Sequence, residues 1–174
     1  VQIEGTLDRP VTNLRFERIT FSYTTWMRPS VKGHVPLQAG MYLTDGYRID
    51  PKMKRNYRNH PLDNQGWLGR PAAAVRVAAA GAIDFEHCHF EHLGSTGVDY
   101  EEAVHGGIIR GCLFRDIVGN GLLVGSFSPA AHETHLPYDP ADRREVCTHQ
   151  RIDNCYFTET GNEDWGTRHP YRAQ

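Results

Sequence analysis

The sequence predicts an all-β chain folded as a right-handed parallel β-helix, which is a three-sided solenoid. Two observations support this fold class. One apolar strand template recurs four times, and the many glycines (17) and prolines (10) favour short strands joined by turns over long helices. The 174 residues suit a single domain. We expect the chain to be a fragment of a longer β-helix, because it opens inside a strand-like run and loses the pattern in an irregular tail over 167–174.

The template consists of two position pairs with one extra residue between them. Within each pair the spacing of two places both side chains on one face of a strand, and the extra residue turns the chain so that both pairs face a common axis. The copies are Leu14-x-Phe16-x-x-Ile19-x-Phe21, Ile83-x-Phe85-x-x-Cys88-x-Phe90, Gly107-x-Ile109-x-x-Cys112-x-Phe114 and Gln150-x-Ile152-x-x-Cys155-x-Phe157.

A third apolar pair accompanies the template, so each coil is predicted to contain three short strands. The pairs are Val75 with Val77, Val98 with Tyr100, and Leu122 with Val124. The step of 24 residues from Phe90 to Phe114 is the length of one coil without a long loop. The other steps are longer and predict insertions at about 27–70 and 126–148.

Three of the four cysteines occupy one template position in successive coils. Cys88, Cys112 and Cys155 are therefore predicted to form an inward ladder, with about 4.8 Å between neighbouring coils. Because free cysteine packs as a small hydrophobe, we expect buried thiols rather than disulfides or metal ligands. Cys147 lies in the second insertion, and the sequence assigns it no role.

The insertions contain the side chains best suited to hold a ligand. Trp26 stands at the entry to the first insertion, which is rich in tyrosine and arginine, and the second contains His132, His135 and Tyr138. Aromatic rings stack on the apolar faces of sugars, while polar groups fix the hydroxyls. These aromatics either bind sugar or cover the side of the solenoid, and the second insertion, polar and rich in proline, is read as a functional loop.

His87 and His89 flank the inward Cys88 and should both point outward. Such a pair on one strand face can bind zinc, but the sequence offers no third ligand. No metal and no cofactor are predicted.

The candidate catalytic residues are carboxylates. Asp99 should stand outward between Val98 and Tyr100, with Arg76 one coil below and Leu123 one coil above; it is either a catalytic group or an ordinary surface ion pair. The other candidates, Asp164 and Glu163, are expected at an edge of the solenoid two coils away from Asp99, a distance of about 9.6 Å. That spacing is compatible with an inverting glycosidase. We expect Asp99 to act as base and the second carboxylate as acid. The second carboxylate is Asp164, with Glu163 as substitute, and the proposed sugar contacts are Trp26, Arg76, His132, His135, Tyr138 and Trp165.

The chain resembles the β-helical enzymes of glycoside hydrolase family 141. The stretches that carry the resemblance are "FERITFSYTTWMRPS", "GHVPLQAGMY", "FEHCHFEHLGSTGVDY", "GCLFRDIVGNGLLVG", "HLPYDPADRREVC" and "NEDWG". The resemblance implies a secreted or periplasmic bacterial enzyme that cleaves plant polysaccharide, with α-L-fucosidase and xylanase activities known in the family. It also implies further coils after "NEDWG", where this chain ends in "TRHPYRAQ". We therefore expect the fragment to lack whatever part of the active site those coils supply and to be inactive where that part is essential.

Two other functions remain open on the same fold. A polysaccharide lyase would need a carboxylate-bound Ca²⁺ and a basic residue, yet the only lysines lie in the first insertion. A non-catalytic carbohydrate-binding β-helix is the second alternative. An oligo- or polysaccharide is the expected partner, with self-association through an uncapped C-terminal coil. A net charge of -2 without a basic band predicts no nucleic-acid partner, and no 18-residue apolar run predicts a membrane span.

Overall fold

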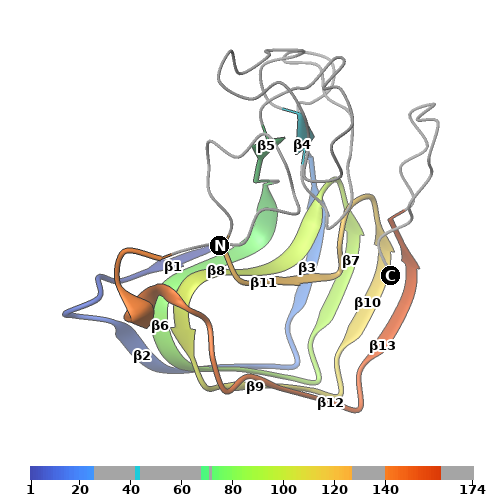
Figure 1. Ribbon diagram of the computed structural model, residues 1–174. Helices are drawn as coiled ribbons and strands as arrows, with labels where there is room; N and C mark the ends of the chain where they lie inside the picture. The colour runs from blue at the N-terminus through green and yellow to red at the C-terminus, as the bar shows by residue number, and fades with distance from the viewer. Residues whose placement is uncertain (26–41, 44–67, 71, 127–139, 162–174) are drawn as a thin grey trace.

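The computed structural model describes residues 1–25, 42–43, 68–70, 72–126 and 140–161 (Figure 1). The described part is built almost entirely of strands and contains no α-helix, only the 3-10 helix η2 at Arg143–Glu145. The expectation of an all-β chain is therefore confirmed. The strands are β1 (Gln2–Glu4), β2 (Val11–Glu17), β3 (Thr20–Thr24), β4 (Tyr42–Leu43), β5 (Leu68–Gly69), β6 (Ala73–Glu86), β7 (His89–Leu93), β8 (Thr96–His105), β9 (Ile108–Arg110), β10 (Leu113–Ile117), β11 (Leu122–Val124), β12 (Arg151–Asp153) and β13 (Tyr156–Thr160).

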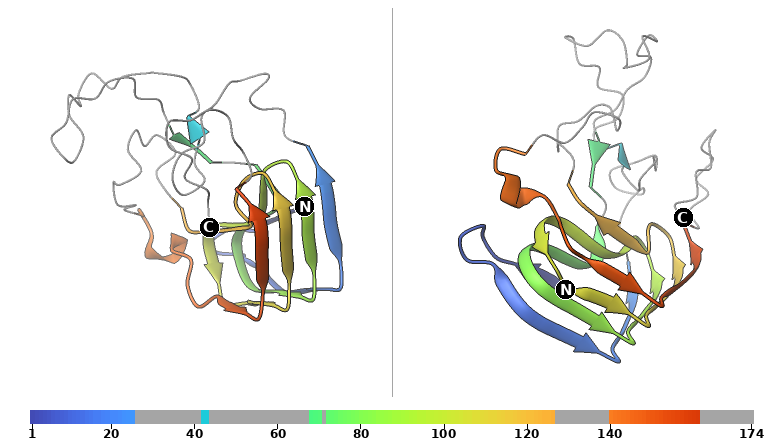
Figure 2. Two further views of the ribbon diagram at one scale, coloured as in Figure 1. Left: turned by 90° about the vertical axis from the view of Figure 1, so that its right-hand side faces the viewer. Right: turned by 60° about the horizontal axis from the view of Figure 1, so that its bottom comes forward.

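Two parallel sheets make up the body of the structure. The first, called sheet A here, has the order β11-β8-β6-β9-β12, with β1 and β2 also paired to β6. The second, called sheet C, has the order β13-β10-β7-β3. Both sheets are curled, and the long strand β6 bends so that it serves two sides of the structure (Figures 1 and 2). The short strands β4 and β5 form a separate antiparallel pair.

The four template copies stack in register, as the sequence predicts. In sheet C, Phe90 pairs with Phe21 on one side and with Phe114 on the other, and Phe114 pairs in turn with Phe157. Their rings form one continuous stack, with centroids 4.9, 4.7 and 4.4 Å apart and nearly parallel planes. Figure 2 shows the four strands of sheet C, β3, β7, β10 and β13, side by side, so that equivalent template positions are neighbours in successive coils.

The extra residue in each template adopts the left-handed backbone conformation. Its φ is 55° at Arg18, 54° at His87, 60° at Gly111 and 50° at Asn154. A residue in the left-handed region redirects the chain sharply. In each copy, this residue follows a strand of sheet A and precedes the inward residue that leads into a strand of sheet C. The predicted turning role of the extra residue is confirmed. At Gly111 a side chain would also collide with the His87 imidazole, whose Nδ1 would lie 2.6 Å from an added Cβ.

The third apolar pair of each coil also lies where the sequence places it. Val98 pairs with Val75 and Leu122, and Tyr100 pairs with Val77 and Val124. All but the last pair are buried in the core. On the last described coil the inward row is open instead, with Val124 46%, Ile152 50% and Phe157 40% exposed. The self-association expected from this row stays a prediction.

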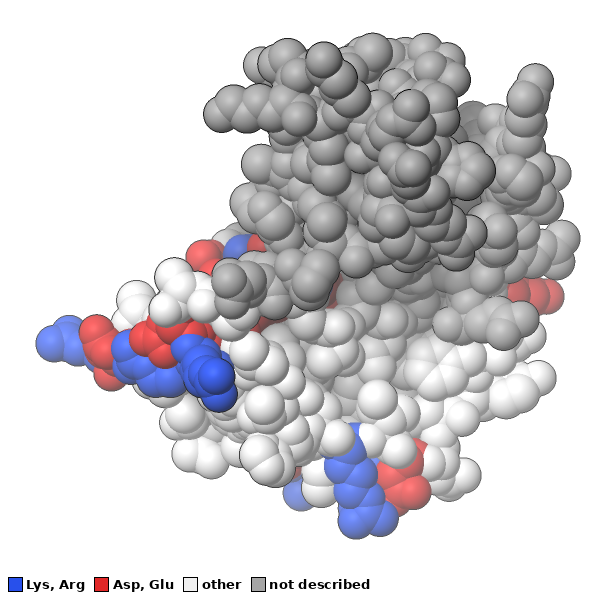
Figure 3. All heavy atoms as spheres, viewed as in Figure 1, with Lys and Arg blue, Asp and Glu red and all other residues white. Residues whose placement is uncertain are grey.

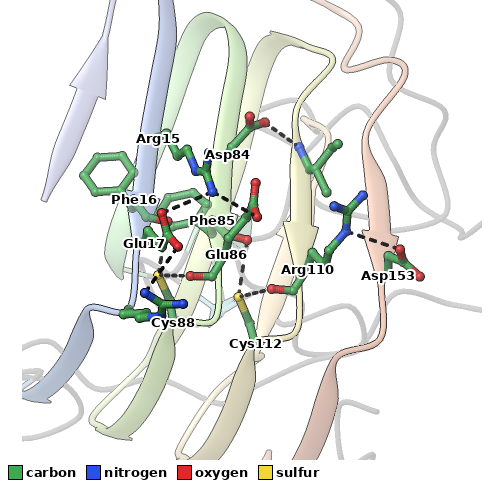
Figure 4. A network of polar contacts seen from close by, with 12 residues as sticks. Arg15, Phe16, Glu17, Asp84, Phe85, Glu86, Cys88, Arg110, Cys112 and Asp153 are labelled. Atoms are coloured by element: carbon green, nitrogen blue, oxygen red, sulfur yellow. Dashed lines mark hydrogen bonds and ion pairs between the residues drawn. The ribbon is translucent and has the colours of Figure 1, made fainter.

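The cysteines form the expected ladder of free thiols. Cys88, Cys112 and Cys155 each donate to a backbone carbonyl of the neighbouring coil, at Phe16, Phe85 and Ile109 respectively, and each sulfur–oxygen distance is 3.4 Å. Figure 4 shows the first two thiols on neighbouring strands. Burial raises the pKa of Cys112 to about 12, so this thiol stays protonated and unreactive near neutral pH. Cys147 is the fourth free thiol and packs against the core from the side of the second insertion.

Charged side chains of the described residues gather in mixed clusters rather than in a band of one sign (Figure 3). Most of them pair between neighbouring coils on the outer faces, as Arg15 does with Glu86 and Arg115 with Glu91. None of the helices in the described ranges is both long and apolar enough to span a bilayer.

Candidate functional site

Asp99 lies in β8 on the outer side of sheet A, between the inward Val98 and Tyr100. Its register neighbours are Arg76 in β6 and Leu123 in β11, which are the neighbours that the sequence predicts. The outward position of Asp99 therefore follows from the alternation of the strand. The surroundings of its carboxylate do not follow from the alternation, and they differ from the expectation.

Asp99 is covered rather than exposed on this outer face, with a residue exposure of 1%. Arg70, which follows β5 at the end of the first insertion, covers it and binds both carboxylate oxygens. Arg70 Nε donates to Asp99 Oδ2 over 2.6 Å, and Nη2 donates to Oδ1. Such a two-point contact fixes the orientation of both groups. A strand of the sheet and the end of an insertion are thereby locked together.

Arg76 is in register with Asp99, yet its guanidinium group binds elsewhere. Its Nε donates to Glu101 in β8 and its Nη1 donates to Glu4 in β1 over 3.2 Å. Arg76 thus connects three neighbouring strands of sheet A. The charge of Arg76 still favours the ionised form of Asp99, but the contacts and charge of Arg70, from the insertion, have the larger effect on the pKa of Asp99.

Burial raises the pKa of Asp99 above its ordinary value, because the charged form loses its hydration. The hydrogen bonds and positive charge of Arg70 oppose this effect without cancelling it, and the charge of Glu101 adds to it. An aspartate with a raised pKa holds a proton more readily than an ordinary one. The role of base expected for Asp99 needs the ionised form, which a raised pKa disfavours, so the direction suits a group that holds and donates a proton better.

A β-bulge lies beside Asp99 in the same strand. Val77 pairs with Tyr100 and Ala78 with Glu102, so Glu101 is an extra residue without an opposite partner in β6. Bulges re-aim side chains and are frequent next to active sites. The side chain of Glu101 remains 22% exposed on this face while it binds Arg76.

Sequence reasoning missed both Glu101 and Arg70 as members of this cluster. A signal for the bulge is present in the spacing of buried residues. After Val77 and Tyr100, the next opposite pair in which both residues are buried is Ala80 and Val104. It lies three residues further along β6 but four further along β8. No comparable pattern marks Arg70, because a long insertion separates it from the repeat that precedes it.

The second insertion returns to the same strand. The Cys147 thiol donates to the backbone carbonyl of Tyr100 over 3.5 Å, and Thr148 bridges to His105 at the end of β8. Burial raises the pKa of Cys147, while the charges of Arg70 and Asp99 also act on it. The ends of both insertions therefore meet the sheet along β8, around Asp99.

The remaining predicted site residues cannot be placed against this cluster. These residues lie outside the described ranges: Trp26, His132, His135, Tyr138, Glu163, Asp164 and Trp165. The separation of Asp99 from Asp164 or Glu163 thus stays a prediction. His87 and His89 are described and both point outward, as expected. Among the described residues no group of three His, Cys, Asp or Glu side chains is arranged to hold a metal ion.

Comparison with known proteins gives one informative match. The chain is 82% identical to a solved structure named "Glycoside hydrolase", with a TM-score of 0.80. The match covers 95% of this chain and 28% of the other, so the chain corresponds to just over a quarter of that protein's length. No family model and no curated protein matches the chain. The match supports the expectation of a glycosidase.

Proposed function

We propose that this chain forms part of a glycoside hydrolase that acts on plant or other complex polysaccharide. The observation that carries the proposal is the 82% identity over 95% of the chain to a structure with that name. Sequences this similar keep one fold, and 82% of the aligned side chains are the same, so we expect the local site to be shared. The substrate class, fucosidase- or xylanase-like, and membership of glycoside hydrolase family 141 rest on the resemblance of the quoted stretches.

We propose further that the stacked sheets form a right-handed parallel β-helix. Successive strands of each sheet are parallel and in register, and the connection between them passes through the other sheet. Connections between parallel strands of one sheet are right-handed in about 98% of cases. From the resemblance alone, we propose that the longer protein is secreted or periplasmic.

The proposed chemistry uses paired carboxylates on the outer face of sheet A. One group protonates the leaving oxygen of the glycosidic bond while a second, ionised, group activates water or stabilises the developing positive charge. Asp99 belongs to this site by position and by its raised pKa. Asp164, with Glu163 as substitute, stays the proposed partner across the bond, and Trp26, Arg76, His132, His135, Tyr138 and Trp165 stay the proposed sugar contacts.

The test is to incubate the full-length protein that contains this chain with xylan, fucosylated xyloglucan and pectin and to measure new reducing ends and free fucose. We expect reducing ends to increase without an unsaturated product absorbing in the ultraviolet. Unsaturated products would identify a lyase instead. Retarded migration in gels containing one of the polysaccharides, with no reducing ends released, would identify a non-catalytic binding protein.

A further inference from the structure

The outer face of sheet A holds two carboxylates, Asp99 and Glu101, in one strand, and they differ in exposure and in hydrogen-bond partners. Asp99 is 1% exposed and both of its oxygens accept hydrogen bonds from Arg70. It could contact a sugar only if Arg70 moved away. Glu101 keeps part of its side chain exposed, and its contact with Arg76 involves one carboxylate oxygen, Oε2.

Both carboxylates face the same side because they stand two residues apart in β8, and the bulge adds a difference between them. Because β8 has one more residue than β6 between the paired positions, Glu101 has no opposite residue and is free of the pairing that fixes its neighbours. Arg76 draws its carboxylate toward β6, and Glu4 joins the same arginine from β1.

We propose that Glu101 is the substrate-facing carboxylate of this sheet face, and that Asp99 is a positioning residue that acts through Arg70. The inference rests on the proposed glycosidase function and deepens it. Glu101, in place of Asp99, would be the base or nucleophile: it removes a proton from the water that attacks the anomeric carbon, or attacks that carbon itself, while the acid across the bond protonates the leaving oxygen. Asp99 would hold Arg70, and with it the end of the first insertion, over the bound sugar.

Sheet C supplies a matched control for this inference. Glu91 in β7 pairs with Arg115 of the next coil over 2.6 Å, and its side chain is 17% exposed, close to the value for Glu101. It therefore has the same chemistry, partner type and exposure, but it lies on the other face and its strand pairs without a register shift. Any effect seen at Glu101 and absent at Glu91 belongs to the site rather than to an inter-coil ion pair.

The first experiment does not depend on turnover. The native chain is treated with a water-soluble carbodiimide and glycine ethyl ester, with and without xylo-oligosaccharide or fucosylated xyloglucan oligosaccharide, and modified peptides are quantified by mass spectrometry. We expect Glu101 to be modified at least 10-fold faster than Asp99, and the oligosaccharide to protect Glu101 but not Glu91. Modification of Asp99 at the rate of Glu101, or equal protection of Glu91, would overturn the inference.

The second experiment measures hydrolysis by the Glu101→Gln, Asp99→Asn and Glu91→Gln variants. We expect Glu101→Gln to lower kcat by about 10²- to 10⁴-fold, the usual contribution of an acid or base group, with KM little changed. Glu91→Gln should keep the wild-type rate. Asp99→Asn and Arg70→Lys should each raise KM more than they lower kcat, and the double variant should be no worse than either, because the two residues act as one unit.

The outcomes separate this inference from the proposed function. If the full-length wild-type protein hydrolyses none of the polysaccharides but the oligosaccharide protects Glu101, the glycosidase function fails and the contact of Glu101 with sugar stands. If the chain hydrolyses a polysaccharide and Glu101→Gln keeps near-normal kcat, the function stands and the assignment of Glu101 is wrong.

Discussion

The outer faces of sheets A and C share one scaffold but differ in regularity. On sheet C, strands pair without a shift, and the charged pairs that cross between coils, such as Arg115 with Glu91 and His92 with Asp116, leave at least one partner well exposed. On sheet A, a bulge interrupts the pairing and Arg70 buries Asp99. Local departures from the repeat therefore mark the candidate site, because burying a charged group costs free energy and the regular repeat does not require it.

The largest expected effect concerns the inward side of sheet C. Replacing Phe114 by Ala should lower the free energy of unfolding by about 3–5 kcal/mol, because it removes a fully buried ring between two stacked neighbours. Phe157→Ala should cost less than half as much, since that ring is partly exposed. Urea denaturation followed by circular dichroism measures both. Equal costs would mean that the ring stack does not stabilise sheet C in the way described.

Loss of an ion pair should lower the free energy of unfolding more on the outer face of sheet A than on that of sheet C. Arg70→Met should destabilise the chain by about 3 kcal/mol at pH 7, because it leaves the buried Asp99 without its partner. Arg115→Met on sheet C should cost less than about 1 kcal/mol, as expected for a surface pair. Equal values would remove the distinction between the faces.

The same variant should depend on pH in a defined direction. The folded-state pKa of Asp99 is raised, so its proton is bound more tightly in the folded chain than in the unfolded chain. Its contribution to stability is present below the unfolded value of 3.8 and is lost as the pH rises through the raised value. Without Arg70 the pKa rises further, so the destabilisation by Arg70→Met should grow as the pH rises above the raised pKa of Asp99 in the wild type. A pH-independent difference would contradict this.

An intermediate effect is expected at the corner between the two sheets. Cys112 lies between β9 and β10, and its pKa rises from 9.0 to about 12 on folding. Stability from this thiol is full below pH 9 and is lost as the pH rises toward 12, by up to about 1.4 kcal/mol per pH unit. Comparing wild type with Cys112→Ala between pH 8 and 10 isolates this slope. Rapid reaction of the native thiol with an aromatic disulfide reagent at pH 8 would contradict its burial.

The smallest expected effect is that of Glu91→Gln, which should change the free energy of unfolding by less than about 0.5 kcal/mol. A larger change would show that the outer pairs of sheet C stabilise the fold, and it would weaken Glu91 as a control for Glu101. The measurement is the same denaturation series used for the other variants.

Much of the fold could be predicted from the sequence because the repeat specifies it locally. Inward Phe90, Phe114 and Cys112 lie where the template places them, and the extra residue turns the chain in all four copies. The site was predicted less well. The position of Asp99 follows from alternation within β8, but the residue that covers it, Arg70, arrives from an insertion whose path no periodicity describes. The outward direction of Glu101 follows from the same alternation, but its place in a bulge appears only when the inward spacing of β6 and β8 is compared, which is one residue longer in β8.

The in-register stacking of coils also fixes the distances between reactive side chains on the outer faces. Neighbouring coils are about 4.8 Å apart, so equivalent side chains on one face are separated by multiples of that step. Moving a carboxylate by one coil would therefore change its distance from a fixed partner in a discrete increment. Glycosidases that retain or invert configuration differ by a carboxyl separation of similar size, about 5–5.5 Å against 6.5–9.5 Å. A bulge such as that at Glu101 supplies a smaller adjustment between these steps. A scaffold of this kind could thus change stereochemical outcome by relocating one side chain, without any change in the path of its backbone.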